Sequence, residues 1–553
     1  MKKTFLTLLT LMATTLATTA QEAVFSYFSY AGKDKRFSKA IDAKKEFLNP
    51  ILAGFYPDPS VCRKGDTYYL VNSSFAFFPG VPIFESKDLV NWTQIGHVLD
   101  RESQLQLQGQ RVSGGIYAPA IAYNKHNDTF YMITTNVGKG GNCYVKTKDP
   151  HQGWSDPIFL PKVDGIDPSF LFDSDGKAYI VHNAPVYGTA DYDGQRAIRL
   201  LEFDVAGDSI VGQPVEIVRG GTHVTEKPIW IEGPHLYHIG KYYYLMCAEG
   251  GTAEGHSEVI FRAKHPKGPW TECPHNPILT QRDLSDDRNE RVTCTGHADL
   301  IQTNSGEWWA VFLGCRPYED NLYNTGRETF LLPVSWKDAW PTILEKGKAI
   351  PTVVEKARLH TQVTGLTGNF SYTDTFKGER LHPRWLSLRN PKVNSFQLTT
   401  HGLALHTTTG SVRDSKPLSA VFCRQQHTTF TAETEVHFTP TSSKTLAGMV
   451  LFQNEQNNIV FGQTMLNGRN AIILKRTEKS EVLIGSAFLP DSEGVRLKIE
   501  ADGRYYTFSY SVGAADSWHV VATGVDGSNL STTRAGGFIG TMIGLYATKR
   551  NGK

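Results

Sequence analysis

The sequence predicts an all-β protein that consists of a five-bladed β-propeller followed by a β-sandwich. Three observations lead to this fold class. One strand-opening pattern recurs over residues 49–345, at steps typical of propeller blades. Alternating polar and apolar runs with intervening turns follow from residue 369 onwards. Fifty glycines and 27 prolines in 553 residues indicate a chain with many turns.

Residues 1–20 have the parts of a secretory signal peptide. A basic pair, an apolar run and small residues ending at Ala20 follow one another in that order. The apolar run is too short to span a bilayer well, so we expect an exported protein, periplasmic or secreted, without membrane insertion. The polar stretch that follows, residues 21–48, is interpreted as an N-terminal arm without an assigned function.

The charge and the cysteines exclude some classes of protein. The formal net charge is +2 and includes Lys2 and Lys3, so removing the signal peptide leaves 2 − 2 = 0. A neutral protein gives no support for binding nucleic acid or an anionic membrane. Seven cysteines without a C-x-x-C motif favour buried free thiols over a disulfide framework.

Five segments share the repeated pattern. In each, a small or acidic residue, usually beside a proline, opens a strand, and a turn then leads into an aromatic-rich strand. The openings are Asp58-Pro59-Ser60, Ala118-Pro119-Ala120, Asp167-Pro168-Ser169, Gly233-Pro234-His235 and His297-Ala298-Asp299. Their central positions are separated by 60, 49, 66 and 64 residues, which fits blades of about four strands each.

The repeat brings distant carboxylates together. Equivalent positions of propeller blades lie on a ring around one axis, so the openings are expected to converge in a central funnel. Asp58, Asp167 and Glu232 stand at three of these openings. Because proline biases the preceding residue towards extended geometry, Asp58 is expected on stiff, extended backbone.

Carboxylates in this arrangement can hydrolyse a glycosidic bond. One must be protonated to supply the leaving group with a proton, and another must be ionised to activate water. We assign Asp58 as the general base, Glu232 as the general acid, and Asp167 as the neighbour that raises the pKa of the acid. Taken singly, each residue would more often be a cap or a turn than a catalyst; the set at equivalent positions favours catalysis.

The pattern stops after Trp340-Pro341, and a second β-rich region begins at Asn369. Residues 431–438, 449–452 and 505–510 are strand-like runs that favour a β-sandwich, and no catalytic motif is evident among them. The predicted domains are the signal peptide 1–20, the arm 21–48, the propeller 49–345, the linker 346–368 and the sandwich 369–553.

Several motifs resemble glycoside hydrolase family 43, in the branch of β-xylosidases and α-L-arabinofuranosidases. The matching segments are residues 49–60, Phe78-Pro79-Gly80-Val81, Gly165-Ile166-Asp167-Pro168-Ser169, Glu232-Gly233-Pro234-His235 and Gly326-Arg327-Glu328-Thr329. The resemblance implies a five-bladed propeller, a concanavalin-like C-terminal jelly roll, the same three carboxylate roles and inversion at the anomeric carbon. Inversion requires room for a water, so the carboxyl groups of Asp58 and Glu232 should lie ~6.5–9.5 Å apart.

The same resemblance implies five substrate-binding residues. Arg327 would hold sugar hydroxyls or Asp58, and the alternative is a structural ion pair with Glu328. Phe75 and Tyr117 would line the sugar pocket, with ordinary core packing as the alternative. Two further residues would reach the same pocket, namely His297 in the funnel and Phe538 from the sandwich.

The chain also departs from the pattern of relatives. The β-xylosidase pattern usually has Trp at the position of Tyr117, which leaves the sugar preference open. In some relatives a histidine such as His297 helps to hold a central calcium ion through water, so calcium in the funnel stays open although no cofactor is required. The chain stops at Gly552-Lys553, where relatives usually continue with another strand, so we expect either that the sequence is cut short or that the sandwich closes differently. A sandwich that carries its own carbohydrate-binding role remains an alternative.

The sequence therefore predicts an exo-acting, inverting glycosidase. We expect release of non-reducing-end α-L-arabinofuranosyl residues from plant cell-wall polysaccharides or oligosaccharides. The first alternative is a β-D-xylosidase or an enzyme with both activities. The second is a propeller that binds carbohydrate without catalysis, which the loss of any of the three carboxylates would favour.

Overall fold

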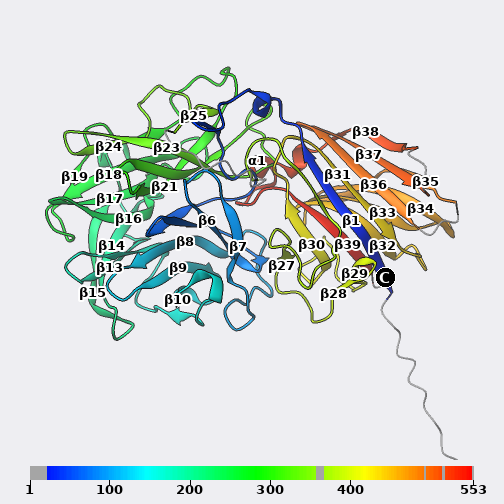
Figure 1. Cartoon of the computed structure of the whole chain (residues 1–553), viewed down its shortest axis with the longest axis horizontal. Coiled ribbons are helices and arrows are strands. Elements are labelled where there is room, and N and C mark those ends of the chain that lie inside the picture. Colours follow the sequence, from blue (N-terminus) through cyan, green and yellow to red (C-terminus); the bar gives the residue numbers. More distant parts are fainter. Residues whose placement is uncertain (1–20, 357–365, 491–493, 514–516, 551–553) are drawn as a thin grey trace, which may run out of the picture.

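The computed structural model describes residues 21–356, 366–490, 494–513 and 517–550. Within these ranges the regular secondary structure is almost entirely β-strand, arranged as two regions side by side (Figure 1). The predicted signal peptide, residues 1–20, lies outside the described residues. In the described part of the chain, no helix is long and apolar enough to cross a membrane.

The first region contains five antiparallel sheets that follow one another along the chain. The first has β3 (Ser60–Lys64), β4 (Thr67–Val71), β6 (Gly80–Ser86) and β7 (Thr93–Leu99). The second has β8 (Gly115–Asn124), β9 (Thr129–Val137), β10 (Gly141–Thr147) and β11 (Ile158–Phe159). The third has β12 (Ile166–Phe172), β13 (Ala178–Pro185), β14 (Arg196–Asp204) and β15 (Ser209–Arg219).

The last two sheets of this region keep the same order. The fourth has β16 (Glu232–Ile239), β17 (Tyr242–Glu249), β18 (Ser257–Ala263) and β19 (Thr271–Glu272), with β20 (Leu279–Thr280) also paired to β18. The fifth has β21 (Thr293–Gln302), β22 (Trp308–Cys315), β23 (Glu328–Lys337) and β24 (Trp340–Thr342). The aromatic strands expected from the repeat are the second strands of all five sheets.

The first strands of the five sheets form a closed circle. β3 contacts β8, β8 contacts β12, β12 contacts β16, β16 contacts β21, and β21 contacts β3 again. This is a propeller-type arrangement, in which strand openings from distant parts of the chain meet at the centre. The apolar core lies between neighbouring sheets, as where Tyr69 of β4 meets Phe130 of β9 edge to face with ring centroids 4.9 Å apart.

The backbone at these openings corrects one prediction. Asp58 is not extended: its φ is 51°, in the left-handed region. The equivalent residues of the other sheets share this conformation, with φ of 34° at Ala118, 56° at Asp167, 54° at Gly233 and 52° at His297. The strand pairing shifts register at the openings of β8, β12, β16 and β21, which marks β-bulges. The shared conformation of all five openings, including the unbulged opening of β3, outweighs the local bias from proline.

The second region is a sandwich of two antiparallel sheets. One sheet has β28 (Phe396–Thr399), β29 (Gly402–His406), β1 (Glu22–Gly32), β31 (Thr429–His437), β36 (Val495–Asp502), β37 (Tyr505–Val512) and β38 (His519–Asp526), with β26 (Ser371–Asp374) also on β1. The other has β30 (Ser419–Arg424), β39 (Met542–Lys549), β32 (Thr445–Asn454), β33 (Asn457–Leu466), β34 (Arg469–Glu478) and β35 (Ser480–Phe488). The only α-helix among the described residues is α1 (Thr532–Ala535).

The N-terminal arm has a structural role that the sequence pattern did not indicate. Its strand β1 lies inside the sandwich sheet, paired with β29 and β31, and is the dark blue strand among the sandwich strands in Figure 1. Phe25 and Phe28 of this strand are fully buried. A register shift between Phe25 and Tyr27 interrupts the alternation of buried and exposed residues. The sequence therefore lacks the strict two-residue period that identifies a strand.

The two regions are joined by further pairing. β5 (Phe77–Phe78) of the first region pairs with β27 (Ser387–Leu388) of the second. β2 (Glu46–Leu48), from the N-terminal arm, pairs with β25 (Val353–Glu355) in the segment between the two regions. Gly326 and Gly540 are so close that a side chain on Gly326 would lie 2.7 Å from the Gly540 backbone. This contact requires glycine and fixes the sandwich against the residue that precedes Arg327.

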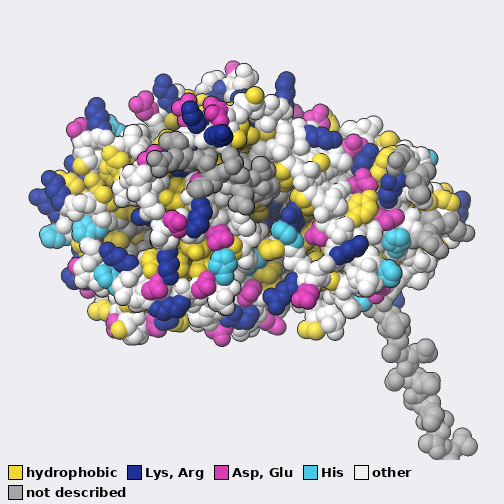
Figure 2. All heavy atoms as spheres, viewed as in Figure 1, with side chains coloured by type: hydrophobic (Ala, Val, Ile, Leu, Met, Phe, Trp, Pro, Cys, Tyr) yellow, Lys and Arg dark blue, Asp and Glu magenta, His cyan; other side chains and the backbone are white. Residues whose placement is uncertain are grey.

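The surface and the cysteines agree with the sequence analysis. All seven cysteines are buried and free, which confirms the prediction of thiols rather than a disulfide framework. Lys and Arg side chains are interspersed with Asp and Glu on the visible face, without a large patch of one sign (Figure 2). Such a face gives no support for a polyanionic partner.

Candidate active site

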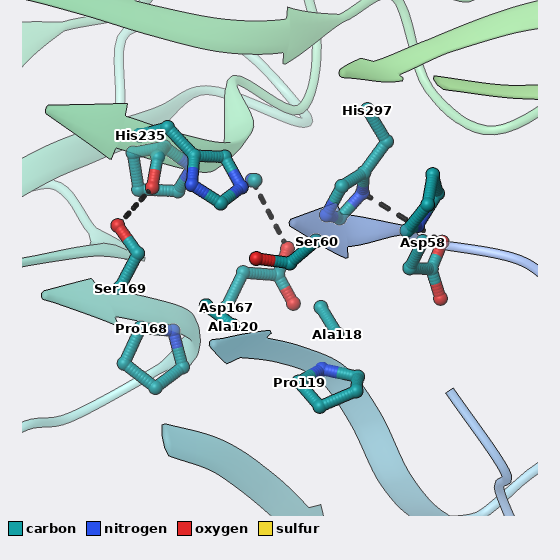
Figure 3. Close-up of a pocket in the computed structure, with 13 residues that line it drawn as sticks. Asp58, Ser60, Ala118, Pro119, Ala120, Asp167, Pro168, Ser169, His235 and His297 are labelled. Atoms are coloured by element: carbon teal, nitrogen blue, oxygen red, sulfur yellow. Dashed lines mark hydrogen bonds and ion pairs between the residues drawn. The ribbon is translucent and has the colours of Figure 1, made fainter. Parts of the chain in front are cut away.

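The strand openings enclose a small cavity at the centre of the propeller-type region. It has a volume of about 10 Å³, close to the space of one water, and is lined by residues from all five openings. Asp58, Asp167, His235 and His297 are among them and come from different sheets (Figure 3). The convergence expected from the repeat is therefore present, and both aspartates are less than a tenth exposed.

Asp58 is held ionised by the groups around it. Its Oδ2 accepts a hydrogen bond of 2.6 Å from Ser73 Oγ, and its Oδ1 lies 3.3 Å from Arg327 Nη1 and 3.7 Å from His297 Nδ1. Burial alone would raise the pKa of Asp58, but Arg327, His297 and the Ser73 hydroxyl outweigh it and leave this pKa below its ordinary value. An ionised carboxylate here can accept a proton.

Glu232 has a raised pKa, in contrast to the lowered pKa of Asp58. It opens β16 and is buried, and no hydrogen-bond or ion-pair partner of its carboxyl is found among the described residues. Burial, followed by the charges of Asp167 and Asp58, raises the pKa of Glu232 to about 8. The carboxyl is therefore protonated at neutral pH and can donate that proton.

The pKa of Asp167 lies between those of Asp58 and Glu232. Its Oδ2 accepts a hydrogen bond of 3.1 Å from the backbone N–H of Gly233, the residue after Glu232. Burial, with a further contribution from the Asp58 charge, raises the pKa of Asp167 to about 7. One buried cluster thus contains a proton acceptor and a proton donor with well-separated pKa values, which acid–base hydrolysis requires.

Three aromatic rings from both regions pack together beside this cluster. The rings of Phe75 and Phe538 are stacked with centroids 5.9 Å apart, and Tyr117 meets Phe75 and Phe538 edge to face at 5.1 and 5.8 Å. Phe538 comes from the sandwich, and its backbone N–H donates a hydrogen bond of 2.9 Å to Ser113 Oγ. The structure therefore brings these three predicted residues to one wall.

Arg327 contacts both the aromatic wall and the carboxylate of Asp58. Its guanidinium lies 5.4 Å from the ring centroid of Phe538 and pairs with Asp58. The alternative ion pair with Glu328 is not formed, because Glu328 pairs with Arg316 through two hydrogen bonds of 2.5 and 2.8 Å. Consecutive side chains of an extended chain point in opposite directions, which sends Arg327 and Glu328 into different clusters.

His297 faces the funnel as predicted, and burial lowers its pKa to about 4. It is therefore neutral near pH 7 and serves as a hydrogen-bonding group rather than a permanent charge. In the described part of the chain, no group of three His, Cys, Asp or Glu side chains could hold a metal ion. Calcium takes six to eight oxygen ligands, so calcium in the funnel stays a prediction.

Sequence analysis missed Ser73 and Arg196. Ser73 Oγ contacts Asp58 and accepts a hydrogen bond of 2.7 Å from the backbone N–H of Ala118, which links two strand openings. Its signal was the polar run Asn72-Ser73-Ser74 that ends an apolar strand. The charge of Arg196 lowers the pKa of both Glu232 and Asp167. No local sequence pattern marks this arginine, which begins β14.

Comparisons with known families divide the chain in two. Residues 47–341 match the model described as glycosyl hydrolases family 43. Residues 373–553 match the model described as the beta xylosidase C-terminal concanavalin A-like domain. The two matches follow the propeller-type region and the sandwich, and the first includes all three carboxylates.

Similar proteins span nearly the whole chain. A "Xylosidase/arabinosidase" of Butyrivibrio fibrisolvens is 37% identical over 91% of this chain and 96% of the relative. A "Non-reducing end alpha-L-arabinofuranosidase" of Bacteroides ovatus is 37% identical over 92% of each chain. A solved structure titled as a GH43_12 retrieved from capybara gut metagenome is 42% identical, with a TM-score of 0.88 over 96% of this chain and all of that one.

Proposed function

Because the chain belongs to glycosyl hydrolase family 43, among its exo-acting xylosidases and arabinofuranosidases, we propose that it is an α-L-arabinofuranosidase. The chain is a glycosidase. The sugar that it releases and the mechanism of release are what we propose. The substrate would be a non-reducing-end α-L-arabinofuranosyl residue on a plant cell-wall polysaccharide or oligosaccharide. We further infer that the five sheets are the five blades of the propeller.

The proposed mechanism depends on Asp58 being ionised while Glu232 holds a proton. The pKa of Asp58 lies below its ordinary value while that of Glu232 is about 8, so one is ionised and the other protonated over the neutral range. Asp58 takes a proton from a water as the water oxygen attacks the anomeric carbon. Glu232 gives its proton to the glycosidic oxygen as the bond between that oxygen and the anomeric carbon breaks.

The reaction would invert the anomeric configuration. Water approaches from the Asp58 side while the leaving group departs on the Glu232 side, so the two carboxyl groups should be ~6.5–9.5 Å apart. Asp167 bonds to the backbone after Glu232 and adds negative charge beside it, which supports its role in positioning the acid and keeping it protonated. Arg327 would hold both Asp58 and sugar hydroxyls.

The preference for arabinofuranose rests on the aromatic wall and on the relatives. Tyr117 stands where the β-xylosidase pattern has Trp, and its hydroxyl is occupied by a hydrogen bond of 2.6 Å to the Ser113 carbonyl. The smaller ring leaves more room in the wall. The Bacteroides ovatus relative is named as an arabinofuranosidase and the Butyrivibrio fibrisolvens relative for both sugars, which keeps an enzyme with both activities as the second candidate.

Turnover of two aryl glycosides tests this proposal. The protein without residues 1–20 is assayed on 4-nitrophenyl α-L-arabinofuranoside and 4-nitrophenyl β-D-xyloside, with proton NMR of the first-formed sugar. We expect faster hydrolysis of the arabinofuranoside and a β-configured product before mutarotation. Faster hydrolysis of the xyloside would favour the β-xylosidase, and turnover of neither would leave a propeller that only binds carbohydrate.

Export and calcium remain separate proposals. We propose that residues 1–20 direct the protein to the periplasm or the medium, which cell fractionation and N-terminal sequencing of the exported protein would test. Among the described residues no group of three His, Cys, Asp or Glu side chains could hold a metal ion, so no step is assigned to a metal. Equal turnover with calcium and with a chelator would agree with catalysis by the side chains alone.

A further inference from the structure

Two loops stand next to Glu232 on the face where the strand openings lie. Residues 186–195 connect β13 to β14, and residues 220–231 connect β15 to β16, which begins at Glu232. The strands of a sheet alternate in direction, so both loops are on the same face as Asp167 at the opening of β12. Neither loop takes part in the site described so far.

Trp230 is the most conspicuous side chain of these loops. It lies two residues before Glu232 and is 39% exposed, whereas Phe75 of the aromatic wall is 1% exposed. Its φ is 53°, a conformation that costs a bulky residue free energy and is found mainly where surrounding structure enforces it. In the described part of the chain its indole N–H has no acceptor. An exposed ring with a free donor can stack on a sugar and bind a hydroxyl.

The surrounding structure fixes the position of Trp230. Its backbone N–H donates a hydrogen bond of 2.8 Å to the Gly194 carbonyl, and the Ile229 carbonyl accepts one of 2.9 Å from Gly250. Farther back in the loop, the backbone N–H of Thr222 donates a hydrogen bond of 2.7 Å to the buried Glu249. The exposed ring therefore stands on a loop that is bonded from both sides, and such preorganisation favours binding.

Arg196 connects Trp230 to the catalytic cluster. Its guanidinium lies 5.2 Å from the indole centroid, and two of its nitrogens donate hydrogen bonds of 2.7 and 3.2 Å to Asn183 Oδ1. Asn183 in turn donates a hydrogen bond of 2.6 Å to the Ile231 carbonyl, directly before Glu232. This network links the indole, through Arg196 and Asn183, to the backbone directly before the proposed proton donor.

A cavity of about 380 Å³ lies between the same two loops. Six of the seven residues that line it carry polar side-chain groups, which can bind the hydroxyls of a sugar, although the exposed surface of the lining is mainly apolar. The volume is within the range of ligand pockets. The lining residues are Asp191, Tyr192, Gln195, Arg219, Val224, Thr225 and Lys227. The cavity lies close to Trp230 along both loops. Gln195, in its lining, follows Gly194, whose carbonyl accepts the hydrogen bond from the Trp230 backbone. Tyr192, also in the lining, donates a hydrogen bond of 2.7 Å from its hydroxyl to the carbonyl of Pro228, two residues before Trp230.

We propose that Trp230 is the platform for the sugar from which the terminal residue is cleaved, and that the cavity beyond it takes the next sugars of the same chain. This inference rests on the proposed function, because the leaving-group side is defined by Glu232 as the acid. The ligand class is a neutral oligosaccharide that bears the terminal pentose. The enzyme is then built for oligosaccharide or polymer leaving groups rather than for small alcohols.

Trp230→Ala and Trp230→Phe test the platform on two substrates that need the same proton. The substrates are methyl α-L-arabinofuranoside, whose leaving group is too small to reach Trp230, and an arabinofuranosyl-substituted xylo-oligosaccharide. We expect Trp230→Ala to lower kcat/KM for the oligosaccharide about tenfold or more. The methyl glycoside should change by less than about twofold, and the Phe variant should recover most of the loss. The matched control is Tyr505→Ala, an exposed aromatic of the sandwich.

Thr225→Trp tests the cavity independently. This exposed loop position lines the cavity, so a large side chain should fill it and remove the gain in kcat/KM between short and long oligosaccharides. Equal losses on both substrates in Trp230→Ala, or no loss on either, would overturn the platform. If the wild type releases no pentose at all, the proposed function fails instead. Calorimetric binding of the oligosaccharide to the wild type and to Trp230→Ala then decides whether the loops bind sugar.

Discussion

Arg327 and Glu328 are neighbours in the chain, yet each belongs to a different buried cluster of charges. Arg327 reaches Asp58 in the active site, and Glu328 reaches Arg316 at the contact between the propeller-type region and the sandwich. Both clusters combine acidic side chains with arginine and exclude most water. They differ in how completely the acidic oxygens are paired.

In the contact cluster every carboxylate oxygen has a donor. Arg316 pairs with Asp34 at 2.7 Å and with both oxygens of Glu328, while Thr429 N–H donates to the other Asp34 oxygen at 2.7 Å. The backbone N–H of Gly54 adds a hydrogen bond of 2.6 Å to Glu328. Burial alone would raise the pKa of Asp34, but the Arg316 charge outweighs it, so Asp34 stays ionised. Such a cluster holds its charges and exchanges no protons.

In the candidate active site one carboxyl, that of Glu232, lacks a hydrogen-bond or ion-pair partner among the described residues. Asp58 is satisfied by Ser73 and Arg327, whereas Glu232 has no partner among the described residues and lies near two other carboxyls. Burial and like-charge repulsion then keep a proton on Glu232 that a fully paired glutamate would lose. The comparison indicates that an unpaired buried carboxyl, rather than burial itself, distinguishes the reactive cluster from the structural one.

The largest expected effect comes from removing the paired charge of the active site. Asp58→Asn should lower kcat on 4-nitrophenyl α-L-arabinofuranoside by about 10³–10⁴-fold, because the amide cannot take a proton from water. The melting temperature should change little, since the amide oxygen still accepts from Ser73. Asp66→Asn, at an exposed turn of the same sheet, is the control. A variant that keeps about a tenth of the wild-type kcat would contradict the role of Asp58.

The corresponding change in the contact cluster should act on stability instead. Arg316→Met leaves Asp34 and Glu328 buried without their cation, which should lower the free energy of unfolding by about 3–5 kcal/mol. Urea denaturation measures this loss. Lys39→Met, which removes an exposed ion pair of 2.6 Å with Glu290, should cost less than about 1 kcal/mol. Equal stability of both variants would remove the distinction between the clusters.

Glu232 should affect kcat/KM strongly only for substrates whose leaving group needs a proton. Glu232→Gln should lower kcat/KM for an alkyl arabinofuranoside by about 10²–10³-fold, because an alkoxide leaves poorly without protonation. A dinitrophenyl leaving group needs little proton transfer, so its loss should be within about tenfold. Steady-state kinetics on both substrates provide the comparison. Similar losses on the two would show that Glu232 supports the fold of the site rather than donating a proton.

The sequence predicted the ring of strand openings and the three carboxylates because both follow from a repeat. Asp58 and Asp167 stand at equivalent places and Glu232 stands one residue before the equivalent Gly233, so positions far apart along the chain come close together in this fold. The left-handed backbone at Asp58 was not predictable from proline bias, since it is shared by all five strand openings where they meet in the funnel. β1 was missed because a bulge interrupts its alternation, and Arg196 because its contacts come from tertiary structure.

The pH dependence of kcat/KM tests most directly whether repulsion between carboxyls keeps Glu232 protonated. In the proposed mechanism the wild type is active with Glu232 protonated, so kcat/KM should fall as the pH rises through about 8. Asp167→Asn removes a negative charge beside Glu232, so its basic limb should move to lower pH by about one unit, or about 1.4 kcal/mol. A basic limb at the same pH in both proteins would contradict the account.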